Sequence, residues 1–158
     1  MPVILGIDPG SNITGFGVIA TDKNKHSYIT SGNIRISKGD LSSQLRQVFI
    51  GIFDLIKKYK PEEVAVEQIF MHVNPSSALK LGQARGAAIV AAAQKEIKFA
   101  EYSARQIKQA VVGYGNAEKS QVQQMVKLLL KLKETPQTDE ADALAVAICH
   151  AHSRSRLR

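Results

Sequence analysis

Val3-Ile4-Leu5-Gly6-Ile7-Asp8-Pro9-Gly10 is the stretch of sequence from which the fold can be worked out. The short apolar run predicts a buried strand over residues 3–7, and Asp8 to Ser11 has the composition of a turn. Thr14 to Ile19 and Ser27 to Ile36 then read as two further strands. The first third of the chain therefore predicts three strands in a meander.

Helices and strands alternate after this meander. Apolar residues at helical spacing predict a helix from about Leu41 to Tyr59, and the chain restarts at Pro61 as a strand that ends in Glu67. The remaining expected elements are a helix from Ser76 or Ser77 to about residue 96, a strand over 98–102, helices over 103–112 and 117–132, and a last helix after Pro136. This order predicts an α/β protein with a mixed five-stranded sheet and helices on both faces. We expect a single domain over residues 1–152 and a basic, flexible tail over 153–158.

Four acids occupy unusual places in this scheme. Asp8 closes the first strand, Glu67 closes Val64-Ala65-Val66, and Asp139 and Asp142 share one face at the start of the last helix. Taken singly, each has an ordinary interpretation: a turn residue, a solvated strand end, or acids that complement a helix dipole. The carboxyl ends of parallel strands are where functional residues gather in such sheets. Together the four acids predict a metal site.

Phosphodiester hydrolysis is the chemistry that such an acidic site would serve. It needs an activated water, a stabilised leaving oxygen and neutralised phosphate charge, and two cations about 4 Å apart supply all three. Mg²⁺ prefers oxygen ligands and retains several waters, so shared carboxylates suit it. A zinc site is disfavoured because Cys149 and His152 have no second pair, and the glycines near the N-terminus do not have the order of a phosphate-binding P-loop.

The balance of charge points to a polyanionic partner. Twenty-one Lys and Arg residues against 14 Asp and Glu give a formal charge of +7. Nucleic acid is the favoured partner, although an anionic membrane or simple solubility would suit the same balance. Cys149 is the only cysteine, so no intrachain disulfide can form. With no signal-peptide pattern before Asp8, we expect a cytoplasmic protein.

Basic and aromatic side chains are expected beside the acids. For any one of the cations a solvated helix face is the competing interpretation. Phe70, three residues after Glu67, would stack on an unpaired base or else fold into the core. The candidates for phosphate contacts are Lys80, Arg85, Arg105, Lys108 and Lys119.

Several spaced motifs occur in an order that resembles the RuvC family of Holliday junction endodeoxyribonucleases. The resemblance spans about Val3 to His152. Its motifs are Gly6-Ile7-Asp8-Pro9-Gly10, Glu67-Gln68-Ile69-Phe70, Ala78-Leu79-Lys80-Leu81-Gly82-Gln83-Ala84-Arg85-Gly86, Ala117-Glu118-Lys119-Ser120 and Asp139-Glu140-Ala141-Asp142-Ala143.

This resemblance implies a ribonuclease H-like fold and Mg²⁺-dependent, symmetric cleavage of four-way DNA junctions during recombination and repair, with two ions per site and Mn²⁺ as a substitute. It also implies a homodimer that works with the RuvA and RuvB branch-migration proteins. The family's catalytic ligands correspond to Asp8, Glu67, Asp139 and Asp142. Its DNA contacts correspond to Phe70, Lys108 and Lys119, and we add Arg85 as a further expected DNA contact.

Two other classes of function compete with this one. Gly6 to Ser11 also resembles the phosphate loop of actin-like and sugar-kinase folds, but those proteins need a second lobe for which this chain is too short. A non-catalytic DNA-junction-binding protein would use the acids only as caps or structural groups.

Overall fold

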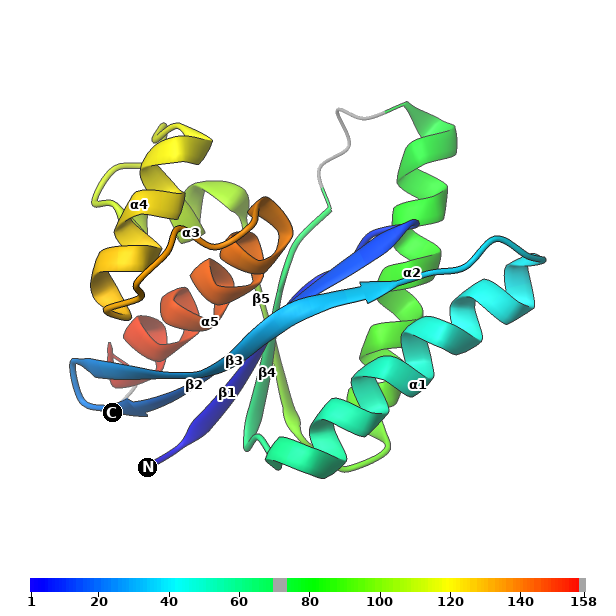
Figure 1. The fold of residues 1–158 in the computed structure, drawn as a ribbon, viewed down its shortest axis with the longest axis horizontal. Coiled ribbons are helices and arrows are strands. Elements are labelled where there is room, and N and C mark those ends of the chain that lie inside the picture. The colour runs from blue at the N-terminus through cyan, green and yellow to red at the C-terminus, as the bar shows by residue number, and fades with distance from the viewer. Residues whose placement is uncertain (70–73, 157–158) are drawn as a thin grey trace.

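The computed structural model describes residues 1–69 and 74–156 (Figure 1). Its elements follow the expected order. They are β1 (Val3–Asp8), β2 (Ile13–Asp22), β3 (Lys25–Arg35), α1 (Leu41–Tyr59), β4 (Glu63–Glu67), α2 (Pro75–Ala93), β5 (Lys98–Tyr102), α3 (Ala104–Val111), α4 (Lys119–Leu129) and α5 (Thr138–Arg156).

The five strands form one mixed sheet in the order β3-β2-β1-β4-β5. β1 is antiparallel to β2 and parallel to β4, and β4 is parallel to β5. Helices α1 and α2 cover one face, while α5 lies on the other with α3 and α4 outside it (Figure 1). The predicted mixed sheet with helices on both faces is confirmed.

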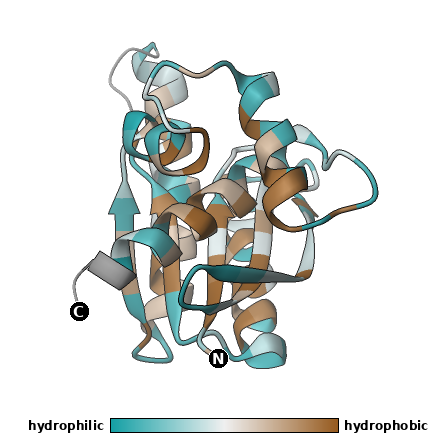
Figure 2. Cartoon of the chain, turned by 90° about the vertical axis from the view of Figure 1, so that its left-hand side faces the viewer, coloured by the Kyte–Doolittle hydropathy of each residue, from teal (hydrophilic) through white to brown (hydrophobic). Residues whose placement is uncertain are grey.

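The pleat of β1 divides the core in two. Leu5 and Ile7 point into the cluster built with α1 and α2, whereas Ile4 points into the cluster built with α3, α4 and α5. Val64 and Ala65 of β4 divide in the same way. Seen from the α3–α5 side, hydrophobic positions lie mainly on the inner strands and helix faces, and hydrophilic positions surround them (Figure 2). Odd and even positions of β1 therefore face different helical layers.

Two glycines allow α5 to lie unusually close to the sheet. A Cβ at Gly6 would stand 2.0 Å from the backbone oxygen of Ala143, and one at Gly17 would stand 2.6 Å from the Leu144 side chain. Gly6 and Gly17 are opposite each other in the β1–β2 ladder. This pair of small residues sets the height of α5 above the sheet.

Several boundaries differ from the expectations. Asn74, not Ser76 or Ser77, caps α2, because its side chain accepts a hydrogen bond from the amide of Ser77. The expected cap by Ser103 on α3 is confirmed. The expected flexible tail does not begin at residue 153: α5 continues to Arg156, and Arg154 is held by a buried carboxylate. No helix in residues 1–69 and 74–156 is long and apolar enough to cross a membrane.

Candidate active site

Asp8 and Glu67 are neighbours at the carboxyl edge of the sheet. They end the parallel strands β1 and β4, and the register pairs Ile7 with Val66 just before them. Asp8 is two residues from Gly6, and Glu67 two residues from Ala65, so both side chains point to the face that α5 covers. Strand periodicity thus puts the two carboxylates on one face of the sheet, and the packing of α5 on that face places its start over them.

Helix α5 brings the other two acids to the same edge. Gly15 pairs with Asp8 across the ladder, and a Cβ at Gly15 would stand 2.3 Å from the backbone oxygen of Asp139. The first turn of α5 therefore rests on the strand beside Asp8. Asp142 follows Asp139 by three residues and occupies the same helix face.

The electrostatics show that the four acids act on one another. Burial raises the pKa of Asp8 to about 8, helped by the negative charges of Asp142, Asp139 and Glu67. Burial also raises the pKa values of Glu67 and of Asp142; nearby Asp142 adds to the first, and Lys119 partly offsets the second. A cluster of ionised carboxylates like this one is unfavourable unless a cation neutralises its charge.

The donor set fits a hard divalent cation. All four groups are carboxylates, the oxygen ligands that Mg²⁺ prefers, and two of them belong to adjacent strand ends. As the side chains stand, no three His, Cys, Asp or Glu residues in the described part of the chain enclose a single ion. A Mg²⁺ ion in a protein is usually bound by one or two carboxylates and keeps several water ligands. The spacing of the four acids is therefore compatible with a Mg²⁺ site.

Two lysines line the same edge, as expected. Lys108 and Lys119 border a hollow of about 340 Å³ together with Glu67 and Asp142. The Nζ of Lys119 lies 3.6 Å from Oδ2 of Asp142, but its side chain is 68% exposed, so this ion pair is weak. Lys119 is the first residue of α4, and its ammonium can turn toward a phosphate without breaking a strong contact.

Arg85 reaches the site from the opposite helical layer. It borders a hollow of about 240 Å³ together with Asp8 and Glu67. One of its terminal nitrogens lies 2.8 Å from the carboxylate of Glu101 on β5, and the Arg85 side chain is largely buried. The structure therefore places Arg85 beside the acids, tied to a carboxylate that the sequence did not suggest.

The other candidates lie elsewhere. Phe70 is outside the described residues. Lys80 faces a separate cavity, and the Arg105 side chain lies against the backbone of Gly115. The disfavoured zinc pair is engaged with backbone, since the Cys149 thiol donates to the carbonyl of Gln106 and His152 contacts the carbonyl of Ala110.

Sequence reasoning missed a buried polar network that fastens α5 to β4. Arg154 donates to Glu63 over 2.6 Å, His150 Nε2 lies 3.1 Å from the same carboxylate oxygen, and His150 Nδ1 lies 2.6 Å from the Tyr102 hydroxyl. Glu63 shares the strand face of Glu67, and His150 and Arg154 are one helical turn apart. The i, i+4 spacing of His150 and Arg154 was a local signal of a shared partner, but it does not identify Glu63, which is 87 and 91 residues away.

Comparison with known proteins places this geometry in a family. A model of "Crossover junction endodeoxyribonuclease RuvC" matches residues 4–150. The chain is 60% identical over 157 residues to the protein of that name from Pseudoalteromonas atlantica, covering 99% of this chain and 91% of that protein. It is also 60% identical over 158 residues to the one from Legionella pneumophila strain Lens, with coverage of 99% and 91%.

Solved structures agree. The Thermus thermophilus RuvC structure in complex with a Holliday junction substrate superposes with a TM-score of 0.94 at 33% identity, covering 99% of this chain and 96% of that chain. The yeast mitochondrial Holliday junction resolvase shares the fold, with a TM-score of 0.70 at 14% identity over 98% of this chain and 80% of that chain. The ribonuclease H-like fold expected from the sequence is confirmed, and the chain belongs to the crossover junction endodeoxyribonuclease RuvC family.

Proposed function

We propose that this chain is a nuclease that resolves Holliday junctions by metal-dependent hydrolysis of phosphodiester bonds. The observation that carries the proposal is the convergence of four acids from β1, β4 and α5 at one edge of a basic protein. Burial and, after it, the negative charges of the other three acids raise the pKa of Asp8 to about 8, and this gives that edge a strong preference for a divalent cation. The family to which the chain belongs supplies the substrate.

In this proposal the acids bind the metal ions and the lysines bind the DNA phosphates. Asp8, Glu67, Asp139 and Asp142 would hold two Mg²⁺ ions, for which Mn²⁺ would substitute, and the chemistry that such ions would supply is activation of a water and neutralisation of phosphate charge. Lys108 and Lys119 hold the phosphates of the strand over the acids, because both line the hollow that Glu67 and Asp142 border. Arg85 approaches from α2, and Phe70 follows the strand that carries Glu67.

The substrate's symmetry requires two such sites. A four-way junction has approximate two-fold symmetry, so a homodimer can cut opposing strands. Helix α2 is the proposed contact, since Leu79 and Val90 are 64% and 50% exposed and Gly86 has open space around it. Such a surface of apolar and small residues favours close helix packing. We further propose that the protein acts in the cytoplasm with RuvA and RuvB, the branch-migration partners expected from the family resemblance.

Cleavage of a labelled synthetic four-way junction tests the proposal. Wild-type protein with Mg²⁺ should make paired symmetric nicks, and EDTA should abolish them; linear duplex is the substrate control. Asp142→Asn should bind the junction and fail to cut it. Asp54→Asn, which removes an exposed acid of α1, is the matched control and should cut normally. Metal-independent binding without cleavage by the wild type would instead identify a non-catalytic junction-binding protein.

A further inference from the structure

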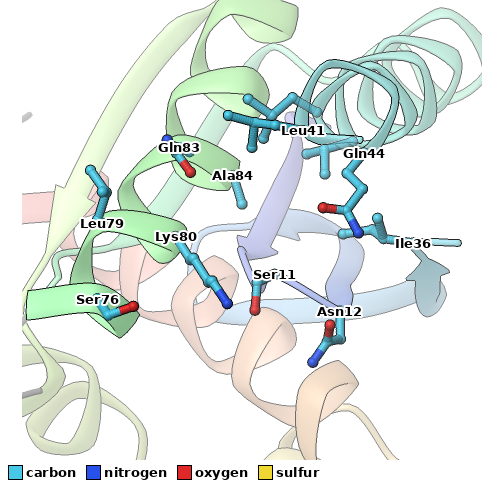
Figure 3. Close-up of a pocket in the computed structure, with 12 residues that line it drawn as sticks. Ser11, Asn12, Ile36, Leu41, Gln44, Ser76, Leu79, Lys80, Gln83 and Ala84 are labelled. Atoms are coloured by element: carbon cyan, nitrogen blue, oxygen red, sulfur yellow. The ribbon is translucent and has the colours of Figure 1, made fainter. Parts of the chain in front are cut away.

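A second cavity lies beside the acidic site, on the other side of the β1–β2 turn. It has a volume of about 450 Å³ and is enclosed by that turn, the start of α1 and the first half of α2. Its floor is apolar, with Val48, Leu45 and Ala84, and its outer lining mixes polar side chains with the exposed Leu41 and Leu79. Figure 3 shows Lys80 extending from α2 toward Ser11 of the turn, with Ser76 and Asn12 nearby.

The charge of this cavity suits an anion. Among the described residues, Lys80 is the one charged residue of the lining, and no carboxylate lies within ion-pair distance of its ammonium. Asp40, the acid that precedes α1, is not part of the lining and is engaged in capping α1 through the amide of Ser43. A cation that has no partner beside hydroxyl and amide donors is the arrangement that binds phosphate.

The helix that carries Lys80 adds to this preference. Ser76 lies in the first turn of α2, a 19-residue helix that begins at Pro75. Ser76 borders the cavity together with Lys80, while the amide of Ser77 in the same turn is engaged by the side chain of Asn74. Three side chains that can donate hydrogen bonds, those of Ser11, Ser76 and Lys80, therefore border one space.

The cavity is a separate space, but residues adjacent in sequence line it and the acidic site. Ser11 and Asn12 follow Asp8 by only three and four residues, in the same turn. On α2, Leu81 and Arg85 border the hollow that contains Asp8 and Glu67, while Lys80 and Ala84, the residues just before them, border the cavity. A DNA strand bound at the acids would therefore run on along the edge of this cavity.

We propose that this cavity is a phosphate-binding subsite for the DNA strand bound at the acids. Lys80 neutralises one backbone phosphate beyond the cleavage point, and Ser11 and Ser76 donate hydrogen bonds to its oxygens. The subsite rests on the proposed function, because its ligand is the same DNA. It would fix the position of the strand on the side opposite Lys108 and Lys119, so that the acids are held between two anchored phosphates.

Salt-dependent junction binding in EDTA tests the subsite. Lys80→Gln should weaken binding about fivefold at 0.1–0.2 M salt and reduce the slope of log K against log[salt] by about one per protomer. The matched control is Lys95→Gln, which removes the same charge from an exposed position that is not part of the cavity lining. Its slope should match that of the wild type.

A neutral methylphosphonate, placed at one backbone position at a time near the crossover, then locates the contact. At one position per strand, the loss caused by the methylphosphonate and the loss caused by Lys80→Gln should not add. Additive losses at every position, or a slope for Lys80→Gln equal to that of Lys95→Gln, would overturn the subsite while leaving the nuclease intact. Failure of the wild type to bind a junction would overturn both proposals.

Discussion

Substitution of Gly6 by alanine should push α5 away from β1 and so disturb the active site while the sheet stays folded. The new Cβ would lie 2.0 Å from the carbonyl oxygen of Ala143 and 3.0 Å from the Ala147 side chain, whereas ordinary contact begins at 3.4 Å. The obstacle is backbone, so α5 must retreat from β1 by roughly 1 Å or more. Overpacking of this kind costs about 1–3 kcal/mol, and the upper end applies here because no flexible side chain can yield.

The same displacement carries Asp139 and Asp142 away from Asp8. A misplacement of about 1 Å in a catalytic group costs on the order of 10²-fold in rate. We therefore expect Gly6→Ala to lower Tm by about 6–12 °C and to reduce the single-turnover cleavage rate about 100-fold at saturating junction and Mg²⁺.

Thermal unfolding followed by circular dichroism and junction cleavage at 20 °C, where the variant remains folded, measure the two effects separately. Gly39→Ala is the matched control, since its Cβ would meet only the Ser43 side chain at 3.6 Å, and both quantities should stay close to wild type. A Gly6→Ala protein that melts within about 2 °C of wild type and cuts at the wild-type rate would refute the close approach of α5 as the determinant of the site.

Three further outcomes are expected. Because burial raises the folded-state pKa of Asp8 from 3.8 to about 8, the metal-free protein loses stability as the pH rises between these two values. Asp8→Asn should therefore raise the Tm over that of the wild type in EDTA at pH 8 and lose this advantage at pH 4; the same Tm difference between variant and wild type at both pH values would contradict this. Burial alone would raise the pKa of Glu63, but its hydrogen bonds with Arg154 and His150 lower it. Glu63→Gln should therefore cost about 2–4 kcal/mol in urea unfolding at pH 7 and progressively less below pH 4, as the wild-type carboxylate protonates. Val90→Glu should put a charge into the proposed dimer contact on α2 and shift the sedimentation coefficient toward that of the monomer, whereas Leu128→Glu, at an exposed position of α4, should not. A Val90→Glu protein that is still dimeric would place the dimer contact elsewhere.

The local sequence pattern was sufficient to predict which face each acid occupies, because that depends only on the geometry of its own strand or helix. Alternation along β1 and β4 puts Asp8 and Glu67 on one face of the sheet, and helical spacing puts Asp139 and Asp142 on one face of α5. Capping by Ser103 was readable for the same reason: donor and acceptor are three residues apart. The carboxyl ends of parallel strands meet at one edge, which makes Asp8 and Glu67 neighbours. The arrival of Asp139 and Asp142 beside them depends on the tertiary packing of α5 against Gly6 and Gly15.

The cations and the buried network required the tertiary structure. Whether the Arg85 side chain reaches the acids or solvent depends on Glu101, which lies on a different element. Lys80 borders a cavity whose walls come from three separate segments. Glu63 and Arg154 are 91 residues apart, so no local pattern pairs them, and that pairing also holds the helix end that composition alone assigned to a flexible tail. The sequence determined which face each acid occupies, because that depends on the period of its own strand or helix. Only the folded structure decided which cations are free to meet a phosphate, because that depends on long-range partners that compete for each charge.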